Sequence, residues 1–139
     1  MNITVGELPR LVRRPSSISG WGVFAAQPIE EDARIVDYKG ELVSQAEGWR
    51  RERRYLPRQR IWIFNINERW VRDAAVGGNI ARYVNHACRP NCYVDVVGHT
   101  IWILASRRIR KGEELTYDYN TDGAANIRCR CRPRCRRIL

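Results

Sequence analysis

Residues 79–92 (NIARYVNHACRPNC) gather several side chains that can bind or orient a ligand. They hold two arginines, a tyrosine, an Asn-His pair and two cysteines among apolar residues. Buried polar groups need hydrogen-bond partners, so an Asn-His step with apolar neighbours indicates a binding site in which polar atoms face a ligand. A histidine alone is more often a satisfied interior residue, but the neighbours of His86 favour the binding site.

The cysteines indicate metal chemistry. Three of the five lie in a C-x-C-x3-C cluster formed by Cys129, Cys131 and Cys135. In a reducing compartment such a cluster favours metal binding over disulfides. A structural zinc site needs four protein ligands, so the fourth is Cys88 or Cys92. The alternative is a disordered tail, rich in arginine and cysteine, that binds no metal.

Two further stretches carry groups suited to a site. Residues 16–25 (SSISGWGVFA) contain Gly20 and Gly22, which permit positive φ and close approach of the backbone to a ligand, although a plain hairpin turn would use them too. In residues 112–119 (GEELTYDY), Tyr117 and Tyr119 are two apart, so an extended strand would point both phenols to one side. Each phenol offers a polar tip on a rigid apolar body.

The elements that must position these residues are mostly short strands. Residues 44–55 predict the one clear helix, because Ser44 and Glu47 form a capping box and Pro57 marks a stop. Strands are expected at 35–39 and 41–43, in a hairpin at 61–71, and at 93–97 and 100–108 around a turn with an exposed His99. Residues 1–10 suggest a lead-in strand or arm, and Asp32 and Gly112 suggest turns. Without βαβ alternation, the chain predicts a mainly β fold with few short helices.

Length, composition and charge limit the number of domains, the location and the partners that the protein can have. The 139 residues suit one domain, no apolar run is long enough for a membrane span, and the N-terminus lacks a signal-peptide pattern. An intracellular protein without membrane contact is expected. The net charge is +10, with six arginines in residues 50–60 and six in residues 128–137. Such clusters can follow a phosphate backbone, which suggests nucleic acid as a secondary contact.

Four stretches in order resemble the SET-domain protein lysine methyltransferases: SGWGVFA, YKGE, GNIARYVNHACRPNC and GEELTYDY. The cysteine tail resembles the family's post-SET zinc motif, with three residues where C-x-C-x4-C is usual. The resemblance implies a SET domain at residues 1–120, with small curled sheets and a C-terminal pseudoknot, and a post-SET zinc-binding tail at residues 121–139. The compact chain resembles bacterial, viral or archaeal-type enzymes, or one module of a larger protein.

The resemblance also implies residue roles. Tyr119 is the expected catalytic tyrosine, and a tyrosine at position 117 implies mainly mono-methylation. The aromatic side chain of Phe64, and less so of Trp62, is a candidate for the channel that admits the substrate lysine. The methyl donor is S-adenosylmethionine, with S-adenosylhomocysteine as the product, and the residues expected to contact it are Gly20, Trp21, Gly22, Arg82, Asn85, His86 and, as an apolar lid, Ile138. The expected Zn²⁺ ligands are Cys88, Cys129, Cys131 and Cys135. Cys92 would then be a free, buried thiol.

The expected function is S-adenosylmethionine-dependent protein-lysine N-methylation. Two alternatives stay open: a catalytically silent SET module that binds a basic protein, and a zinc-stabilised nucleic-acid-binding module. Substrate candidates are histone-like, DNA-packing or ribosomal proteins. The location would be the cytoplasm or nucleoid of a bacterium, or the nucleus if the protein is eukaryotic or acts in a host. The sequence leaves the oligomeric state open.

Overall fold

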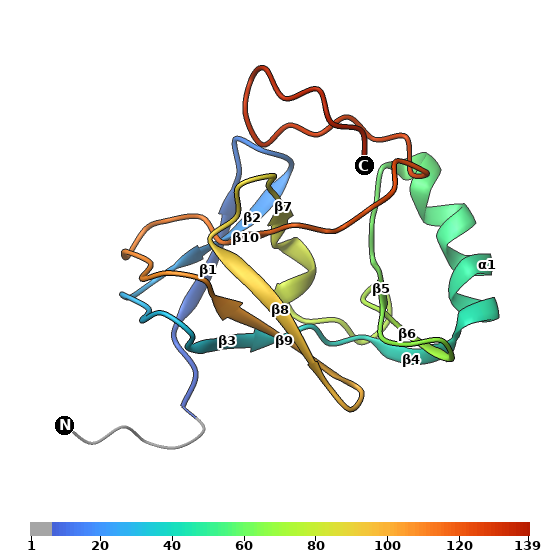
Figure 1. Ribbon diagram of the computed structural model, residues 1–139, viewed down its shortest axis with the longest axis horizontal. Coiled ribbons are helices and arrows are strands. Elements are labelled where there is room, and N and C mark those ends of the chain that lie inside the picture. The colour runs from blue at the N-terminus through green and yellow to red at the C-terminus, as the bar shows by residue number, and fades with distance from the viewer. Residues whose placement is uncertain (1–6) are drawn as a thin grey trace.

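The structure is a computed structural model that describes residues 7–139. The first strand, β1 (Leu11–Pro15), pairs antiparallel with β2 (Trp21–Ala25) across the turn that contains Gly20, whose φ is +44°. Residues 7–10 are irregular, and the rest of the expected lead-in arm lies outside the described residues. After β2 the chain turns at the edge of the molecule and runs back into the next strand (Figure 1).

The central sheet has the strand order β3-β9-β8 and carries much of the core. Its strands are β3 (Arg34–Asp37), β8 (Cys92–Val97) and β9 (Thr100–Ala105), and the last two form a hairpin through Gly98 and the exposed His99. Ile101, Ile103 and Ala105 of β9 are fully buried, as an alternating apolar strand predicts. The turn at residues 98–99 is therefore confirmed, and the strands expected at 35–39 and 100–108 are present but end earlier, at Asp37 and Ala105.

A second sheet, in the order β4-β6-β5, carries the helix. Its strands are β4 (Glu41–Ser44), β5 (Ile63–Asn65) and β6 (Trp70–Asp73), and α1 (Gln45–Tyr55) follows β4 directly. The Ser44 hydroxyl accepts from the Glu47 N–H at 3.2 Å, as predicted, but the Glu47 carboxylate binds Arg50 instead of returning to Ser44. Pro57 lies in a 3-10 turn, η1 (Leu56–Arg58), just past the helix end. Figure 1 shows α1 on one flank.

The third feature is a parallel pair that joins distant parts of the chain. A 3-10 turn, η2 (Ile80–Tyr83), leads into β7 (Asn85–His86), which pairs with β10 (Thr116–Tyr117). On the other side of β10, Asn91 donates from Nδ2 to Glu114 O and accepts from the Thr116 N–H, both at 2.9 Å. The segment carrying β10 is thus held between β7 and the loop that follows β7. This is the C-terminal pseudoknot that the resemblance implied.

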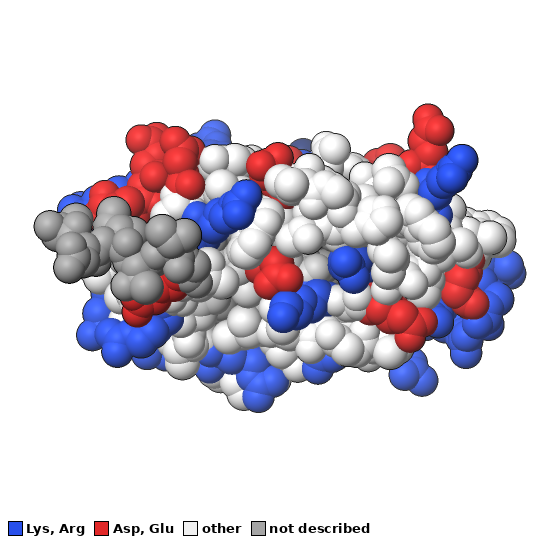
Figure 2. All heavy atoms as spheres, turned by 90° about the horizontal axis from the view of Figure 1, so that it is seen from below, with Lys and Arg blue, Asp and Glu red and all other residues white. Residues whose placement is uncertain are grey.

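Charges of both signs share the surface. Figure 2, seen from below relative to Figure 1, shows Lys and Arg interleaved with Asp and Glu and separated by uncharged atoms, without one continuous basic stripe on that face. Among the described residues, no helix is long and apolar enough to cross a membrane.

A buried carboxylate fixes α1 on its sheet. Asp73, at the end of β6, is fully buried and accepts hydrogen bonds from Tyr55 Oη at 2.7 Å, Arg51 at 3.0 Å and the Ala75 N–H at 2.9 Å. Arg51 also reaches Glu41, whose side chain is 43% exposed. One arginine therefore binds a buried and an exposed carboxylate.

The buried Asp73 and the exposed Glu41, which bind the same arginine, allow a matched test of stability. Asp73→Asn should lower the free energy of unfolding by about 2–4 kcal/mol, because it leaves the buried partners of the carboxylate mismatched. Glu41→Gln, which removes the exposed partner of the same arginine, should cost at most about 0.5 kcal/mol. Urea unfolding followed by circular dichroism measures both. Equal losses would contradict the role assigned to burial.

Candidate active site

Two cavities lie on either side of Tyr119. One, of about 420 Å³, lies among the β1–β2 turn, η2, β7 and the C-terminal tail. The other, of about 560 Å³, lies between the segment of β5 and the start of β8. Tyr119 and Ile61 line both cavities. The two cavities therefore share a wall, and the phenol of Tyr119 is part of it.

Tyr119 is held at two points by the segment around β7. Its hydroxyl donates to the Val84 carbonyl at 2.5 Å, and its backbone N–H donates to His86 Nδ1 at 3.0 Å. Burial lowers the pKa of His86 and outweighs the opposing effect of Asp118, so the imidazole is neutral with Nδ1 as the acceptor. The ring of His86 meets the ring of Tyr119 edge-on at 5.4 Å. The predicted proximity of residues 85–86 to Tyr119 is thus present.

Asn85 joins the first cavity to the glycine turn. Its side-chain amide donates to the carbonyls of Ser19 at 3.1 Å and Trp21 at 3.0 Å, and to Glu114 Oε2 at 3.0 Å. Glu114 in turn accepts from the Ser16 hydroxyl at 2.8 Å. A Cβ on Gly22 would come within 2.4 Å of the Glu114 carboxylate, so this position has no room for a side chain.

Most of the residues expected at the donor site line the first cavity. They are Gly20, Trp21, Arg82, Asn85 and His86. Gly22 lies behind this wall, against Glu114. Ile138 does not line the cavity either: it is 44% exposed, whereas Leu139 is 6% exposed and lines it. The bridge between Arg128 and Ile138 makes the tail locally extended, so successive side chains face opposite ways and Leu139 takes the inward place.

The second cavity has an aromatic floor. The rings of Tyr117 and Tyr119 are 4.8 Å apart, Phe64 is 5.9 Å from Tyr117, and Tyr38 is 5.0 Å from Phe64. All four line this cavity, whereas Trp62 lines the first. Burial raises the pKa of both Tyr117 and Tyr119 well above the ordinary phenol value. Both phenols are therefore protonated near neutral pH and act through hydrogen bonds.

The Tyr117 hydroxyl differs from those of Tyr38 and Tyr119, the other two phenols of the aromatic floor, in its hydrogen bonding. Tyr38 donates to the Trp62 carbonyl at 2.8 Å and Tyr119 donates to Val84. Within residues 7–139, no group accepts a hydrogen bond from Tyr117. Its hydroxyl remains available to a molecule in the cavity.

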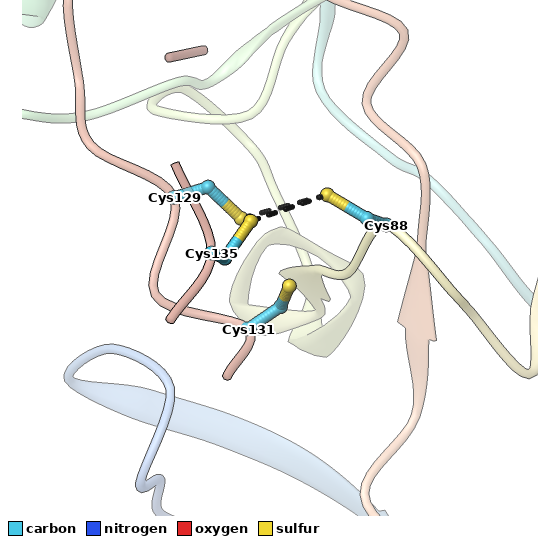
Figure 3. Close-up of side chains that lie close together, drawn as sticks. All are labelled: Cys88, Cys129, Cys131 and Cys135. Carbon is cyan, nitrogen blue, oxygen red and sulfur yellow. Dashed lines mark hydrogen bonds between the residues drawn. The ribbon is translucent and has the colours of Figure 1, made fainter. Parts of the chain in front are cut away.

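Four cysteine thiols converge beside the first cavity. Cys88, from the loop after β7, faces Cys129, Cys131 and Cys135 of the tail, and all four sulfur atoms lie within 4.8 Å of one another (Figure 3). The Sγ atom of Cys88 is 3.8 Å from Cys129 and 3.7 Å from Cys135. Four sulfurs placed tetrahedrally about 2.3 Å from a zinc ion would be about 3.8 Å apart. The donor set therefore fits zinc.

The fifth cysteine lies elsewhere. Cys92 is buried at the start of β8, and its thiol donates to Asn91 Oδ1. Burial raises the pKa of Cys92 to about 12. It is therefore a protonated interior thiol apart from the cluster, as the sequence predicts.

Three site residues carry roles that sequence reasoning did not assign. Glu114 ties Asn85 to the glycine turn, Asn91 holds β10, and Tyr38 completes the aromatic floor. Glu114 lies in GEELTYDY and Tyr38 in YKGE, so the motifs contained them. Their partners are 23 to 98 residues away, and no spacing in the sequence indicates such contacts.

Comparison with known proteins gives a consistent set of matches. Residues 20–120 match the family described as SET domain. Histone-lysine N-methyltransferase trr of Drosophila melanogaster is 40% identical over 133 residues, which cover 89% of this chain and 6% of that protein. Histone-lysine N-methyltransferase 2D of Homo sapiens is 42% identical over 124 residues, covering 84% of this chain and 2% of that protein. The chain thus spans a few per cent of the length of these relatives.

Solved structures show the same relationship. A chain in the crystal structure of Polycomb repressive complex 2 from Chaetomium thermophilum aligns with a TM-score of 0.75 and 35% identity. The alignment covers 84% of this chain and 16% of the chain in that structure. A structure of the complex in an autoinhibited conformation, bound to S-adenosylmethionine, has a TM-score of 0.75 and 36% identity, over 83% and 16% of the two chains. With a mainly β fold, two cavities that meet at a partly buried tyrosine and a family match over residues 20–120, the chain belongs to the SET domain family.

Proposed function

We propose that this chain is a protein-lysine N-methyltransferase domain that uses S-adenosylmethionine. The observation that carries the proposal is the position of Tyr119, which separates two cavities and contributes to both. A donor in one cavity and an amine in the other would meet at this residue. The names of the relatives, histone-lysine N-methyltransferases, and the donor bound in one structural neighbour support the assignment.

The first cavity is the proposed donor site. Trp21 offers an aromatic face, Asn85 fixes the carbonyls of the glycine turn, and Arg82 and His86 add polar groups. Leu139 and Ile127 of the tail supply the apolar side of the wall. Gly22 contributes by allowing Glu114 to approach the turn.

The second cavity is the proposed lysine site. Its aromatic walls exclude water around the amine, and a nearby sulfonium favours loss of the ammonium proton to solvent. The nitrogen lone pair then forms a bond to the methyl carbon as the carbon–sulfur bond breaks, and the electron pair stays on sulfur. Because the Tyr119 hydroxyl donates to Val84, its oxygen lone pairs can accept from the amine and fix the line of attack.

The four-cysteine cluster is proposed to hold Zn²⁺. When bound, the ion supplies a structural link and takes no part in methyl transfer. The Arg137 N–H lowers the pKa of Cys135 to about 7, and burial raises the pKa of Cys129 to about 12. Zinc binding deprotonates thiols that would not all ionise together without it. The link would join Cys88 of the domain to the tail that walls the donor cavity.

The substrate class follows from the relatives. Their names specify histones, so a lysine of a histone-type protein is the proposed target, and an intracellular site such as the nucleus belongs to the proposal. Mono-methylation is a further part of it, because the free hydroxyl of Tyr117 lies in the lysine cavity. Bound to the amine or to a water, that hydroxyl would occupy space that added methyl groups need.

Tyr119→Phe tests the core of the proposal. The variant should lower kcat by about 10²–10³-fold, because it removes a preorganised polar group at the reacting atoms. Binding of S-adenosylmethionine, measured by isothermal titration calorimetry, should change by no more than about twofold. Transfer of labelled methyl to histones gives the rate. A variant with the wild-type kcat would refute the role of Tyr119, and a wild type without transfer would refute the function.

Tyr117→Phe tests how many methyl groups the product lysine carries. Removing this hydroxyl should shift mass-spectrometric product distributions from mono- toward di- and trimethyl-lysine. The matched control is Tyr38→Phe, since Tyr38 lies in the same cavity but its hydroxyl is bound to Trp62. The control should leave the distribution mainly mono-methylated. Identical distributions for wild type and Tyr117→Phe would remove the basis for the mono-methylation proposal.

Metal content tests the zinc site. Purified protein should contain about one zinc per chain, because one tetrahedral set of four thiols is present. Cys135→Ser should lose the metal, while Cys92→Ala, a change at the buried cysteine outside the cluster, should keep it. Chelation should make residues 121–139 protease-sensitive and weaken donor binding while the central sheet stays folded. A zinc-free protein with an ordered tail would contradict this site.

A further inference from the structure

The first cavity is lined by basic side chains and by no acidic ones. Its charged lining residues are four arginines: Arg60 after η1, Arg82 of η2, and Arg128 and Arg130 of the tail. Among the described residues, no aspartate or glutamate lines this cavity. Guanidinium groups stay protonated in proteins, so the four arginines keep their positive charge at any physiological pH.

The guanidinium groups of the cavity have no carboxylate partner. Within residues 7–139, none of the four forms an ion pair. Arg60 lies 6.0 Å from the ring of Trp62, and Arg82 donates to neutral oxygens. By contrast, Arg50 and Arg51 of α1 both bind carboxylates. The arginines of the cavity are therefore free to bind an anionic ligand.

The two ligands already proposed do not use up this charge. S-adenosylmethionine has a sulfonium, an ammonium and a single carboxylate, so it is a net cation, and one guanidinium can bind its carboxylate through two hydrogen bonds. A zinc ion with four thiolates has about two negative charges, fewer than the positive charges of the four arginines. The cavity would therefore stay positive with both of these ligands in place.

The same cavity has an aromatic face beside the glycine turn. Trp21 is 46% exposed and lines the cavity together with Tyr83. The Arg13 guanidinium lies 4.4 Å from the centre of the Trp21 ring and 4.9 Å from that of the Tyr83 ring, so it restrains both. Aromatic side chains and guanidinium planes stack on nucleic-acid bases. A cavity of about 420 Å³ thus offers surfaces for a flat base and for a polyanion.

We propose that the first cavity also binds adenosine polyphosphates such as ATP, in competition with the methyl donor. Adenosine is the part that ATP and S-adenosylmethionine share, so both would use the aromatic face. The exposed guanidinium groups of Arg60, Arg128 and Arg130 can turn toward the phosphates and bind their oxygens in pairs. Methylation would then decrease as the nucleotide concentration increases. The choice of adenosine and the competition rest on the proposed function, whereas the affinity for a polyphosphate does not.

Isothermal titration calorimetry with adenosine, AMP, ADP and ATP tests the binding, without Mg²⁺ because that ion neutralises phosphate charge. Each added phosphate should tighten binding by about tenfold, since it adds charge-assisted hydrogen bonds. Raising KCl from about 50 to about 200 mM should weaken ATP binding several-fold and donor binding by less than about twofold. In the methylation assay, ATP should raise the KM for the donor and leave kcat unchanged.

Single arginine variants test the contacts. Arg60→Gln and Arg128→Gln should each weaken ATP binding by about tenfold, while binding of the cationic donor should stay the same or tighten slightly. The matched control is Arg54→Gln, which removes an exposed arginine of α1 outside this cavity and should change the affinity for neither ligand. Zinc content at the wild-type level in each variant shows that the tail has kept its fold.

Several results would overturn the nucleotide site. They are ATP that binds no more tightly than adenosine, tripolyphosphate that binds as tightly as ATP, full affinity for ATP in both cavity variants, and ATP binding that leaves the KM for the donor unchanged. The two proposals can also fail separately. Phosphate-dependent ATP binding in a protein that neither binds S-adenosylmethionine nor transfers methyl groups would keep the polyphosphate site and refute the methyltransferase. Methyl transfer without ATP binding would do the reverse.

Discussion

The site depends on one short parallel pairing. Two residues of β7 and two of β10 form it, and the Asn91 side chain holds β10 from the other side. Parallel strands cannot be joined by a tight turn, so the chain must leave the site, build the β8–β9 hairpin and return. This return brings Tyr119 against His86 and Val84. Without it, neither cavity would have its shared wall.

The C-terminal tail, residues 121–139, is also positioned by contacts between distant parts of the chain. It follows the threaded segment and folds back so that the Ile127 and Leu139 backbones pair at 2.7 and 3.3 Å. Arg137 also binds Asp118 at 3.1 Å, next to Tyr119. The tail has little apolar core of its own, with Cys129, Cys135 and Leu139 as its buried members. Its place beside the first cavity therefore relies on the cysteine cluster, whose side chains Figure 3 shows, and on a few polar contacts.

Local features of this fold could be predicted from the residues themselves, whereas the long-range contacts that were predicted, Tyr119 beside residues 85–86 and Cys88 beside the tail cysteines, came from the family resemblance. Ser44 caps α1 as expected because the signal lies within one helical turn. Only half of the capping box forms, since Arg50 and Arg51 compete for Glu47. The inward turn of Leu139 instead of Ile138 depends on the register of the tail bridge. A shift by one residue reverses which side chains face inward, and composition does not set that register.

Asn85 shows how much of the arrangement depends on a single atom. Its side-chain nitrogen lies near three oxygen acceptors, two carbonyls and the Glu114 carboxylate. Deamidation would replace that nitrogen by an oxygen and a negative charge at nearly unchanged volume. Each of the three attractions would become a repulsion, and the β1–β2 turn would separate from β7. Chemical ageing at this one amide would therefore open the molecule where its distant segments meet.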